Sequence, residues 1–448
     1  MKLPFTGLVT YLSFNGEKAF EYLKKLAVDI GSRPSGTDAE RRSAEWILSE
    51  FKKLGLDARF EEFDAFTGSV KAKKLEVIEP YRKEIPCEVM PLSGSTGPSG
   101  VTGNIIHLDS YDEEYITEDV EGKIIITSGG PANRHRAFAQ LKKYTPAGII
   151  IIESTPKAMA KNLWGSPTYR KKYVDIPMVR VTFEDGVNLV KSEARSIRLI
   201  AVTEEKPIKT QNVVAEIKGT LRPEEIIIVG GHYDTVLEVP GAGDNAGGTA
   251  IVLELARVFK ESGSKRTMRF IAWGCEELGL LGSREYAKRL REASEAAKKE
   301  DEEAITDLEN TVLCLNLDVH GGLIGTNSAK VLGPPELTAA VKLLSKEKGV
   351  VFDVSESVYS SDGTPFSAVG VPSVSLSRDT PTNLLMHSRE DEIKWLSPGV
   401  LRKHGVFAEE FLKRYVADAA AWPFERKIPE KQKKEIEEYF KKAGRKLP

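Results

Sequence analysis

Cysteine is scarce in this chain of 448 residues, and neither sign of charge is in excess. The three cysteines, Cys87, Cys275 and Cys314, are odd in number and far apart, which fits a reducing compartment better than a disulfide framework. With 64 basic and 66 acidic residues, the chain has no cationic surplus that would attract phosphate backbones or anionic membranes. We therefore expect no nucleic-acid partner.

Long apolar runs are also missing. No window approaches the roughly 18 consecutive apolar residues of a membrane-spanning helix, and the opening MKLPFTGLVTYLSF lacks the small-residue cleavage pattern of a signal peptide. We expect a cytoplasmic protein without a membrane partner, and we leave open whether it forms a homo-oligomer. With 41% hydrophobic residues, a chain of this length can bury a large core, and its length favours two or three domains.

The spacing of apolar residues changes along the chain. Apolar residues three or four positions apart predict helices near residues 20–30 and 44–54. From about Lys74, short β-branched runs such as NIIHLD, GKIIITSG and AGIIIIES predict a β-rich region. Beyond Asn212, apolar strands alternate with helices, which predicts an α/β fold with a mostly parallel mixed sheet sandwiched by helices. Residues 429–444 have the pattern of a charged, peripheral helix.

Histidines and carboxylates follow the predicted strands of the α/β region. The strands end in GGHYDT, WGCEEL and NLDVHG, and GAGDNAGG precedes the helix between the first two. Because ligand sites in open parallel sheets lie at the carboxyl ends of the strands, we expect these side chains to meet at one edge. They are His232, Asp244, Glu277 and Asp318, and His387 in the polar loop LMHSRED is the best second imidazole. Imidazole and carboxylate bind ions such as Zn²⁺, and two neighbouring ions need a bridging carboxylate.

Two further acidic residues complete the predicted chemistry. Adjacent residues point in different directions, so Glu277 can bind metal while Glu276 faces the water between the ions. A metal-bound water has a pKa of about 7, and Glu276 can take its proton and pass it to the leaving amine. Asp234, two residues from His232 on an extended segment, is placed to hold the second imidazole nitrogen.

Several of these residues also have a purely structural interpretation. Asp244 is suited to cap a helix N-terminus, and the pair Glu276 and Glu277 is suited to an exposed helix start. Tyr359 is either a hydrogen-bond donor to a substrate carbonyl or a packing residue. Asp362 either caps the following turn or supports the site from behind. Tyr359 and Asp362 are our candidate substrate-binding residues.

The order of these motifs resembles that of the co-catalytic zinc aminopeptidase family, which also contains leucyl aminopeptidases, glutamate carboxypeptidases, the transferrin receptor and glutaminyl cyclases. The resemblance runs from about Arg33 to Leu401. It rests on five motifs in the family's order, which in this chain are His232–Tyr233–Asp234, Asp244–Asn245–Ala246–Gly247, the Glu276–Glu277 pair before Gly279–Leu280 and Gly282–Ser283, Asn316–Leu317–Asp318 and the late His387.

The resemblance implies two Zn²⁺ ions per subunit, bridged by Asp244. Glu277 and His387 would hold one ion, and His232 and Asp318 would hold the other. The implied activity is that of a metallo-aminopeptidase, which hydrolyses the N-terminal bond of peptides with a free N-terminus. In that family the first residue of the Glu-Glu pair is the general acid/base.

The resemblance also implies a domain organisation. Residues 1–65 and 206–420 would form a discontinuous zinc peptidase domain, and residues 421–448 a charged C-terminal helix appended to it. Residues 66–205 look like an inserted, β-rich protease-associated domain, because they contain VEGKIIITSGG and a later Ile176–Pro177 before a strand. In relatives this domain lies over the cleft and limits substrate size.

Three alternative functions stay open. A carboxypeptidase or dipeptidase would use the same zinc site but needs arginines for a carboxylate, and near the motifs we find only Arg284 and Arg378. Glutaminyl cyclisation uses a single zinc in this family, and a receptor-like member without activity would have lost ligands. Two departures from the family matter: Gly363 replaces a bulky residue and would leave a roomier pocket, and His320 is either an extra ligand or a loop residue.

Overall fold

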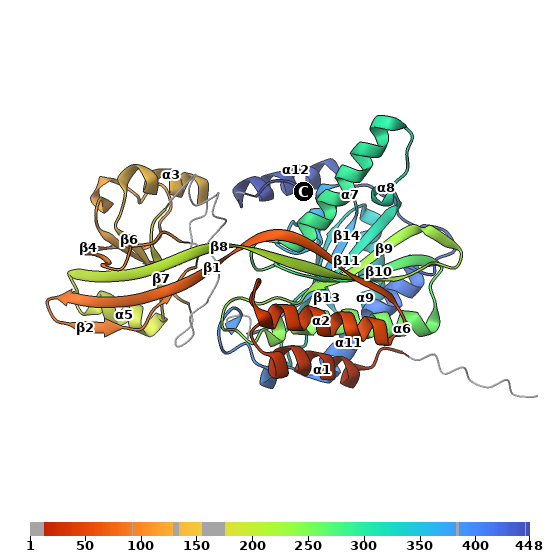
Figure 1. Ribbon diagram of the computed structural model, residues 1–448, viewed down its shortest axis with the longest axis horizontal. Helices are drawn as coiled ribbons and strands as arrows, with labels where there is room; N and C mark the ends of the chain where they lie inside the picture. The colour runs from red at the N-terminus through yellow and green to blue at the C-terminus, as the bar shows by residue number, and fades with distance from the viewer. Residues whose placement is uncertain (1–12, 92, 129–133, 155–174, 382–384, 444) are drawn as a thin grey trace, which may run out of the picture.

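The computed structural model describes residues 13–448 except 92, 129–133, 155–174, 382–384 and 444. Figure 1 shows two lobes of unequal size, which are joined by the long strands β1 (Asp57–Glu79) and β8 (Ser196–Ile217). The larger lobe contains the predicted α/β region, and the smaller lobe contains the β-rich region.

A mixed sheet with the strand order β13-β12-β14-β11-β9-β10-β8 forms the centre of the larger lobe. Its strands besides β8 are β9 (Arg222–His232), β10 (Arg266–Trp273), β11 (Thr311–Leu317), β12 (Thr326–Leu332), β13 (Phe352–Ser355) and β14 (Ser373–Asp379). The four central strands β14, β11, β9 and β10 are parallel neighbours, whereas β12 and β8 pair antiparallel on either side of them. The predicted mostly parallel sheet is therefore confirmed, and β12 is a strand that the sequence analysis missed.

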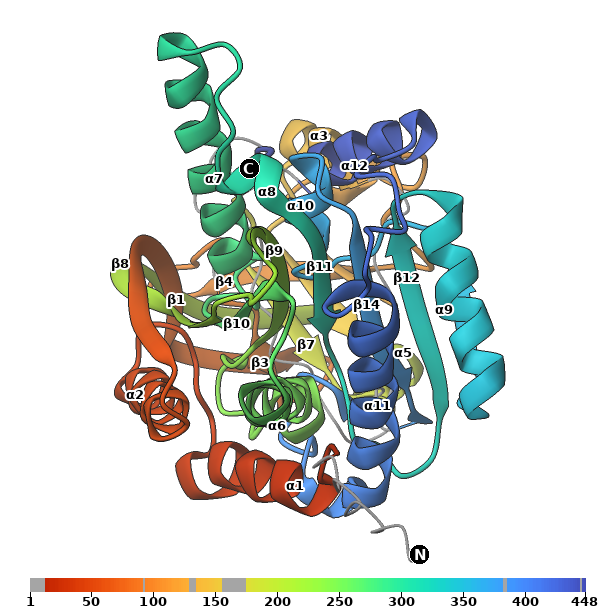
Figure 2. The same ribbon diagram turned by 90° about the vertical axis from the view of Figure 1, so that its right-hand side faces the viewer.

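Helices cover both faces of this sheet (Figure 2). One face carries α1 (Gly16–Lys24), α2 (Asp38–Lys53), α6 (Gly247–Ser262), α9 (Pro335–Lys348) and α11 (Pro398–Phe411). The other face carries α7 (Leu281–Glu300), α8 (Asp307–Asn310), α10 (Thr364–Ala368) and α12 (Glu430–Lys442). Short helical turns are η1 (Lys25–Ile30), η3 (Ala242–Ala246), η5 (Ile393–Trp395) and η6 (Leu412–Val416).

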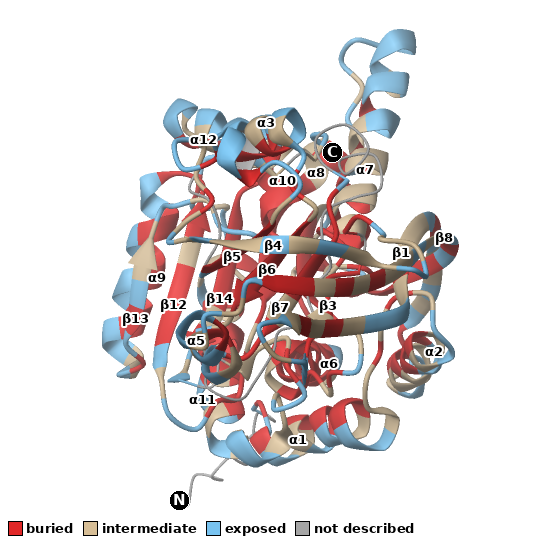
Figure 3. Cartoon of the chain, turned by 90° about the vertical axis from the view of Figure 1, so that its left-hand side faces the viewer, coloured by how far each residue is buried: buried red, intermediate tan, exposed pale blue. Residues whose placement is uncertain are grey.

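The central strands send alternate side chains into two cores, because successive residues of a strand point to opposite faces. In β9, Ile227 and Val229 pack on the side of α6 and α11, whereas Ile226 and Ile228 pack on the side of α7 and α10. All residues of β11 are buried, and Figure 3 shows β12 of the same sheet as a mostly buried strand. Burial on both faces explains why the central strands are continuous apolar runs in the sequence.

The smaller lobe has its own sheet and its own apolar cores. Its elements are β2 (Lys83–Ile85), β3 (Glu88–Val89), β4 (Val101–Leu108), η2 (Glu118–Val120), β5 (Ile124–Ser128), α3 (Arg134–Tyr144), β6 (Gly148–Ile152), β7 (Met178–Val181) and α5 (Phe183–Lys191). Strands β4, β5, β6 and β7 are parallel neighbours in that order. Ile124 and Ile126 enter one core of this lobe, and Ile125 enters the other.

Strands β1 and β8 pair antiparallel along nearly their whole length and belong to both lobes. The expected boundaries at 65/66 and 205/206 fall inside this ladder, where Ala65 pairs with Ile208 and Phe66 with Pro207. The ladder is continuous with the sheets of both lobes, since β8 also pairs with β10 and with β4. Within the part of the chain that the structure describes, none of the helices is long and apolar enough to cross a membrane.

Candidate active site

Four neighbouring parallel strands end at one edge of the sheet and carry the predicted site residues there. His232 is the last residue of β9, and Asp318 directly follows β11. Glu276 and Glu277 lie in the turn after β10, and His387 lies in the loop after β14. The edge that parallel strands share thus brings together residues that are far apart in the sequence.

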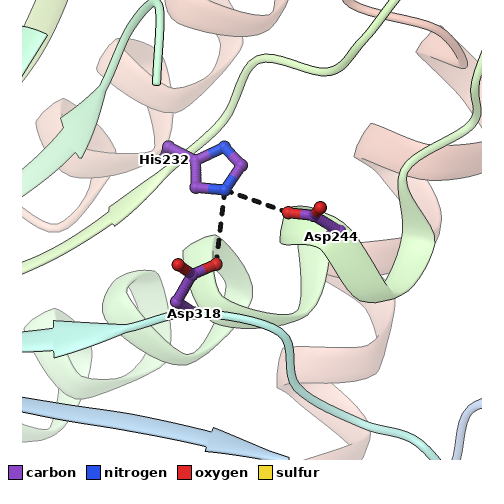
Figure 4. Close-up of side chains that lie close together, drawn as sticks. All are labelled: His232, Asp244 and Asp318. Carbon is purple, nitrogen blue, oxygen red and sulfur yellow. Dashed lines mark ion pairs between the residues drawn. The ribbon is translucent and has the colours of Figure 1, made fainter. Parts of the chain in front are cut away.

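His232 stands at the centre of a first cluster, which Figure 4 shows in close-up. Its Nε2 atom lies 3.1 Å from Asp244 Oδ1 and 3.3 Å from Asp318 Oδ1. Glu276 Oε2 lies at 4.0 Å from the same nitrogen. Three potential ligand atoms, one each from His232, Asp244 and Asp318, lie within 4.8 Å of one another. One metal ion can contact all three at once.

Asp244 is shared with a second cluster. Its Oδ2 atom lies 3.0 Å from His387 Nε2, and Glu277 Oε2 lies 3.2 Å from the same nitrogen. Each cluster therefore receives one oxygen of the Asp244 carboxylate. A carboxylate between two sets of ligands is the arrangement that bridges a pair of metal ions.

Buried polar atoms without a hydrogen bond mark the same positions. His232 Nε2, Glu277 Oε1 and Asp318 Oδ1 are buried and have no hydrogen-bond partner among the described residues. Since buried polar groups are normally satisfied, these atoms need a partner that the described polypeptide does not supply. Divalent cations meet that need, and a set of imidazole and carboxylate donors suits Zn²⁺.

Burial and neighbouring charges shift the pKa values of the cluster. Burial raises the pKa of Glu276 well above its usual value, and the carboxylates of Glu277 and Asp362 add to this effect. Burial also raises the pKa of Glu277. Burial of His232 opposes its charged form and by itself would lower its pKa. The surrounding carboxylates, of which Glu276 has the largest effect, outweigh burial and raise the pKa of His232. Without cations, the cluster therefore favours bound protons, which metal ions would displace.

Asp234 lies behind His232 and is completely buried. Its Oδ1 atom is 3.5 Å from His232 Nδ1, in keeping with the role expected of it. Its carboxylate also accepts hydrogen bonds from the main-chain N–H groups of Glu276, at 3.0 Å, and Glu277, at 3.3 Å. Ser35 Oγ donates a further hydrogen bond at 3.0 Å. One side chain thus positions both the imidazole and the acidic turn, and the second of these roles was not predicted.

Asp391 holds the main chain of the shared carboxylate and was missed by sequence reasoning. Its two oxygens accept hydrogen bonds from the N–H groups of Gly243, at 2.9 Å, and Asp244, at 3.0 Å. Burial raises the pKa of Asp391 to about 6. The only sequence signal was an acidic residue four positions after His387 in a polar loop.

Asn245 connects the two segments that supply Asp244 and Asp318. Its Nδ2 atom donates to the Leu317 carbonyl at 2.9 Å, and its Oδ1 atom accepts from the Val319 N–H at 3.1 Å. Asn245 is completely buried. The side chain therefore brackets Asp318 through its two sequence neighbours and fixes its distance from Asp244.

Arg33 is a buried cation beneath the site that the sequence analysis did not single out. Its guanidinium donates to five main-chain carbonyls, those of Leu26, Gly31, Tyr233, Pro240 and Gly241. Burial lowers the pKa of Arg33 to about 10. The acidic groups of the site oppose that shift, and Asp391 has the largest effect among them. Arg33 thus binds the main chain on both sides of residues 234–239, and these hydrogen bonds fix the loop that leads from His232 to Asp244.

The purely structural interpretations of Asp244, Glu276 and Glu277 do not match the structure. Asp244 has non-helical dihedral angles (φ −117°, ψ 93°), and α6 begins after Ala246 without a side-chain cap. The side chains of Glu276 and Glu277 are only 13% and 6% exposed, so they are not a solvated acidic pair.

A cavity of about 420 Å³ opens onto both clusters. Tyr359 lines it and is 49% exposed, as a residue that contacts substrate would be. Asp362 does not line it: its side chain is completely buried and accepts a hydrogen bond from Ser283 Oγ at 2.5 Å. Burial raises the pKa of Asp362 to about 7. Asp362 is therefore corrected from a substrate-binding residue to one that supports the site from behind.

Two departures from the family pattern lie away from this cavity. His320 Nδ1 faces His404 Nδ1 at 2.9 Å, so His320 is a buried loop residue and not an extra ligand. A side-chain carbon placed on Gly363 would lie 2.8 Å from Ser375 Oγ, so that space is already filled. The expectation of a roomier pocket at Gly363 was wrong.

An arginine does reach the cavity, but it is neither of the two that we considered. Arg284 and Arg378 do not line the cavity, and both donate to main-chain carbonyls. Arg445 lines it, together with Tyr439 of α12 and the following Ala443. The sequence analysis treated this terminal segment as peripheral, and it had no signal that the segment reaches the site.

Comparison with known proteins places this site in a family. The model of peptidase family M28 matches residues 212–412, which include both clusters. This part of the chain therefore has the sequence of an M28 peptidase. Aminopeptidase YwaD of Bacillus subtilis strain 168 is 28% identical over 416 residues, which are 88% of this chain and 83% of that protein.

Two further similar proteins are named for different reactions. A crystal structure of a zinc aminopeptidase from Bacillus subtilis matches with a TM-score of 0.73 and 26% identity, covering 94% of this chain and 99% of that one. Carboxypeptidase Q of Bos taurus is 27% identical over 286 residues, which are 60% of each chain. The family match confirms the resemblance seen in the motifs, and the structural likeness confirms the α/β fold predicted from the apolar runs.

Proposed function

We propose that this M28 protein is a zinc-dependent aminopeptidase, which hydrolyses the N-terminal bond of peptides with a free N-terminus. The observation that carries the proposal is the sharing of Asp244 between two clusters, with one carboxylate oxygen in each. The Bacillus subtilis aminopeptidases, which are similar over most of the chain, support the choice of reaction.

The proposed zinc ligands divide between the two clusters. His232 and Asp318 would hold one ion, Glu277 and His387 would hold the second, and Asp244 would contact both. When bound, the two ions would supply a water of lowered pKa and would polarise the carbonyl of the scissile bond. The four carboxylates that line the cavity would balance the charge of two divalent cations.

Glu276 is the proposed general acid/base. It lines the cavity, and its Oε2 atom lies 4.0 Å from His232 Nε2. Its carboxylate accepts a proton from the attacking water and donates it to the nitrogen of the leaving amine as the C–N bond breaks. Asp234 is the proposed positioning residue, because it holds the main chain of Glu276 and the ring of His232.

We further propose that residues 66–205 are a protease-associated insertion into a discontinuous peptidase domain of residues 1–65 and 206–420, with 421–448 appended. The separate cores of the smaller lobe and the M28 match from residue 212 support this division. A cytoplasmic location and the lack of nucleic-acid and membrane partners stay predictions, as does any homo-oligomer.

Metal content and a substrate panel test the proposal together. We expect about two zinc ions per chain by inductively coupled plasma mass spectrometry. We also expect release of p-nitroaniline from aminoacyl anilides but not from their N-acetylated forms. A metal-free protein without turnover on any member of the panel would contradict the proposal.

A carboxypeptidase or dipeptidase is the second candidate. Carboxypeptidase Q of Bos taurus is similar to this chain, and Arg445 lines the cavity, where it could meet a carboxylate. Cleavage of N-acetylated peptides at their C-terminal bond would favour this candidate over the aminopeptidase and would leave the zinc site as proposed.

A further inference from the structure

One wall of the cavity comes from a segment outside the family match. Tyr439, Ala443 and Arg445 line the cavity together with the candidate zinc ligands. The M28 match ends at residue 412, so these residues lie beyond it. Figure 2 shows α12 beside α10 at the edge of the larger lobe.

Apolar packing and hydrogen bonds fix this segment against the peptidase lobe. Ile436 and Phe440 are each 1% exposed and pack with Leu332 and Ile428. The Tyr439 hydroxyl donates to Ser360 Oγ at 2.8 Å. These contacts make α12 a fixed part of the cavity wall.

A second anchor follows α12. Arg284 Nη2 of α7 donates to the Lys446 carbonyl at 2.7 Å. Arg445 is therefore held between two attachments, α12 before it and this hydrogen bond after it. Its side chain is in turn fixed by Tyr439, whose hydroxyl accepts from Arg445 Nη1 at 2.6 Å.

The guanidinium of Arg445 lies against the turn that carries Glu276. A carbon placed on Gly279 would lie 2.9 Å from Arg445 Nε and 3.1 Å from its Cζ, so the guanidinium lies directly against this glycine. The N–H of Gly279 donates to the Glu276 carbonyl at 2.7 Å in the same turn. The cation therefore lies beside the turn that carries the proposed base, and both residues line the cavity.

The charge of Arg445 is not matched by a carboxylate. Among the described residues, no ion pair joins it to Asp or Glu. Two divalent cations would already balance the four carboxylates of the cavity, so the guanidinium is a surplus positive charge there. It would repel the free amine of a substrate. The planar guanidinium can instead donate two parallel N–H hydrogen bonds to a carboxylate.

We propose that Arg445, positioned by Tyr439, is a subsite for a carboxylate on the leaving-group side of the peptide. The inference rests on the proposed aminopeptidase function. The carboxylate has two sources: the C-terminus of a short peptide, or an acidic side chain in the residue after the cleaved bond. Substrates that present it are bound more tightly than neutral analogues.

Paired dipeptides and the variant Arg445→Ala test the subsite. All of these dipeptides begin with the same residue, which is the one that the wild-type protein releases fastest from the aminoacyl anilides. One pair compares a free C-terminus with its amide, and a second pair of amides compares glutamate with glutamine after the cleaved bond. In the wild type, kcat/KM should favour the charged member by about 10- to 100-fold, mainly through KM. Arg445→Ala should abolish that preference.

The pair that loses its preference identifies the source of the carboxylate. Arg445→Lys should keep a part of the preference, because lysine keeps the positive charge but lacks the paired N–H donors of the guanidinium. Lys442→Ala, at the exposed last position of α12, is the matched control and should keep all of it. If neither preference differs between wild type and Arg445→Ala while anilides are cleaved, the subsite is wrong and the aminopeptidase stands. If nothing in the panel is cleaved, both fail.

Discussion

The carboxylate of Asp234 accepts a hydrogen bond from the main-chain N–H of Glu276 at 3.0 Å. The same oxygen, Oδ1, lies 3.5 Å from Nδ1 of His232, and the other accepts from the N–H of Glu277 at 3.3 Å. One buried side chain at the end of β9 therefore sets the positions of a candidate ligand and of the turn after β10. The separation of His232 from Glu276 depends on this residue.

Asp234→Asn should weaken both functions of that contact. The two N–H groups of the acidic turn bind different oxygens of Asp234, and asparagine replaces one of those oxygens with an NH₂ group that cannot accept. We expect kcat/KM or zinc affinity to fall by about 10- to 100-fold, measured by steady-state kinetics and by zinc titration with a competing chelator. Asp64→Asn, at an exposed position of β1, is the control. Wild-type values for both quantities in Asp234→Asn would contradict the assigned role.

Glu276→Gln should separate chemistry from metal binding. Glutamine keeps the shape of the side chain but cannot accept the proton of the attacking water. We expect kcat to fall by about 10²- to 10⁴-fold, with zinc content unchanged by mass spectrometry. Glu277→Gln, one residue away, should instead lose zinc from the second cluster. A Glu276→Gln enzyme with wild-type turnover would show that another group acts as the base.

The strands that position the site were predictable because each is a continuous apolar run, which marks burial on both faces. Residues at their carboxyl ends, such as His232 and Asp318, follow from the topology of a parallel sheet. The long pair β1 and β8 was not predictable in its full extent. Most of its residues in the bridge between the lobes are exposed or half-buried, so no apolar pattern marks them.

The parts of the site that were missed depend on contacts between distant segments. Arg33 bonds to a carbonyl 200 residues away, and Asp391 bonds to main-chain groups of Asp244 that have no sequence signature. Arg445 reaches the cavity only because α12 packs back onto the lobe. Motif spacing identifies side chains that bind a ligand, but it carries no information about the residues that hold them from another part of the chain.

Asp391→Asn should loosen the turn that presents the shared carboxylate. The amide offers one acceptor, whereas Gly243 and Asp244 each donate an N–H to this side chain. We expect zinc affinity to fall by about 10- to 100-fold, as for other residues that orient metal ligands. Asp353→Asn, on an exposed position of β13, should bind zinc as the wild type does. Equal zinc affinity in the two variants would contradict a positioning role for Asp391.

Removal of metal should lower the thermal unfolding midpoint. The chelated protein keeps several buried carboxylates side by side, with atoms of His232, Glu277 and Asp318 unsatisfied. Zinc that binds the folded state alone should stabilise it by about 2.7 kcal/mol at a free concentration of 100 times Kd. The midpoint, followed by circular dichroism during zinc titration, should rise in the wild type and rise less in Asp244→Ala. Equal responses would show that zinc does not use this carboxylate.

Arg33→Met should destabilise the fold more than any exposed arginine substitution. The guanidinium is fully buried and satisfies five main-chain carbonyls, including those of Tyr233 and Gly241 at the two sides of the loop after β9. Methionine fills much of the volume but leaves these carbonyls without donors, so we expect a loss of about 3–5 kcal/mol in the free energy of unfolding.

The effect should extend to metal binding, because the loop pinned by Arg33 leads from His232 to Asp244. The measurement is guanidinium chloride unfolding of the metal-free protein, followed by zinc titration under native conditions. Arg42→Met, at an exposed position of α2, should change the unfolding midpoint little and zinc affinity not at all. If Arg33→Met is as stable as Arg42→Met, the buried cation is not what holds the loop, and the five carbonyls must be satisfied in another way.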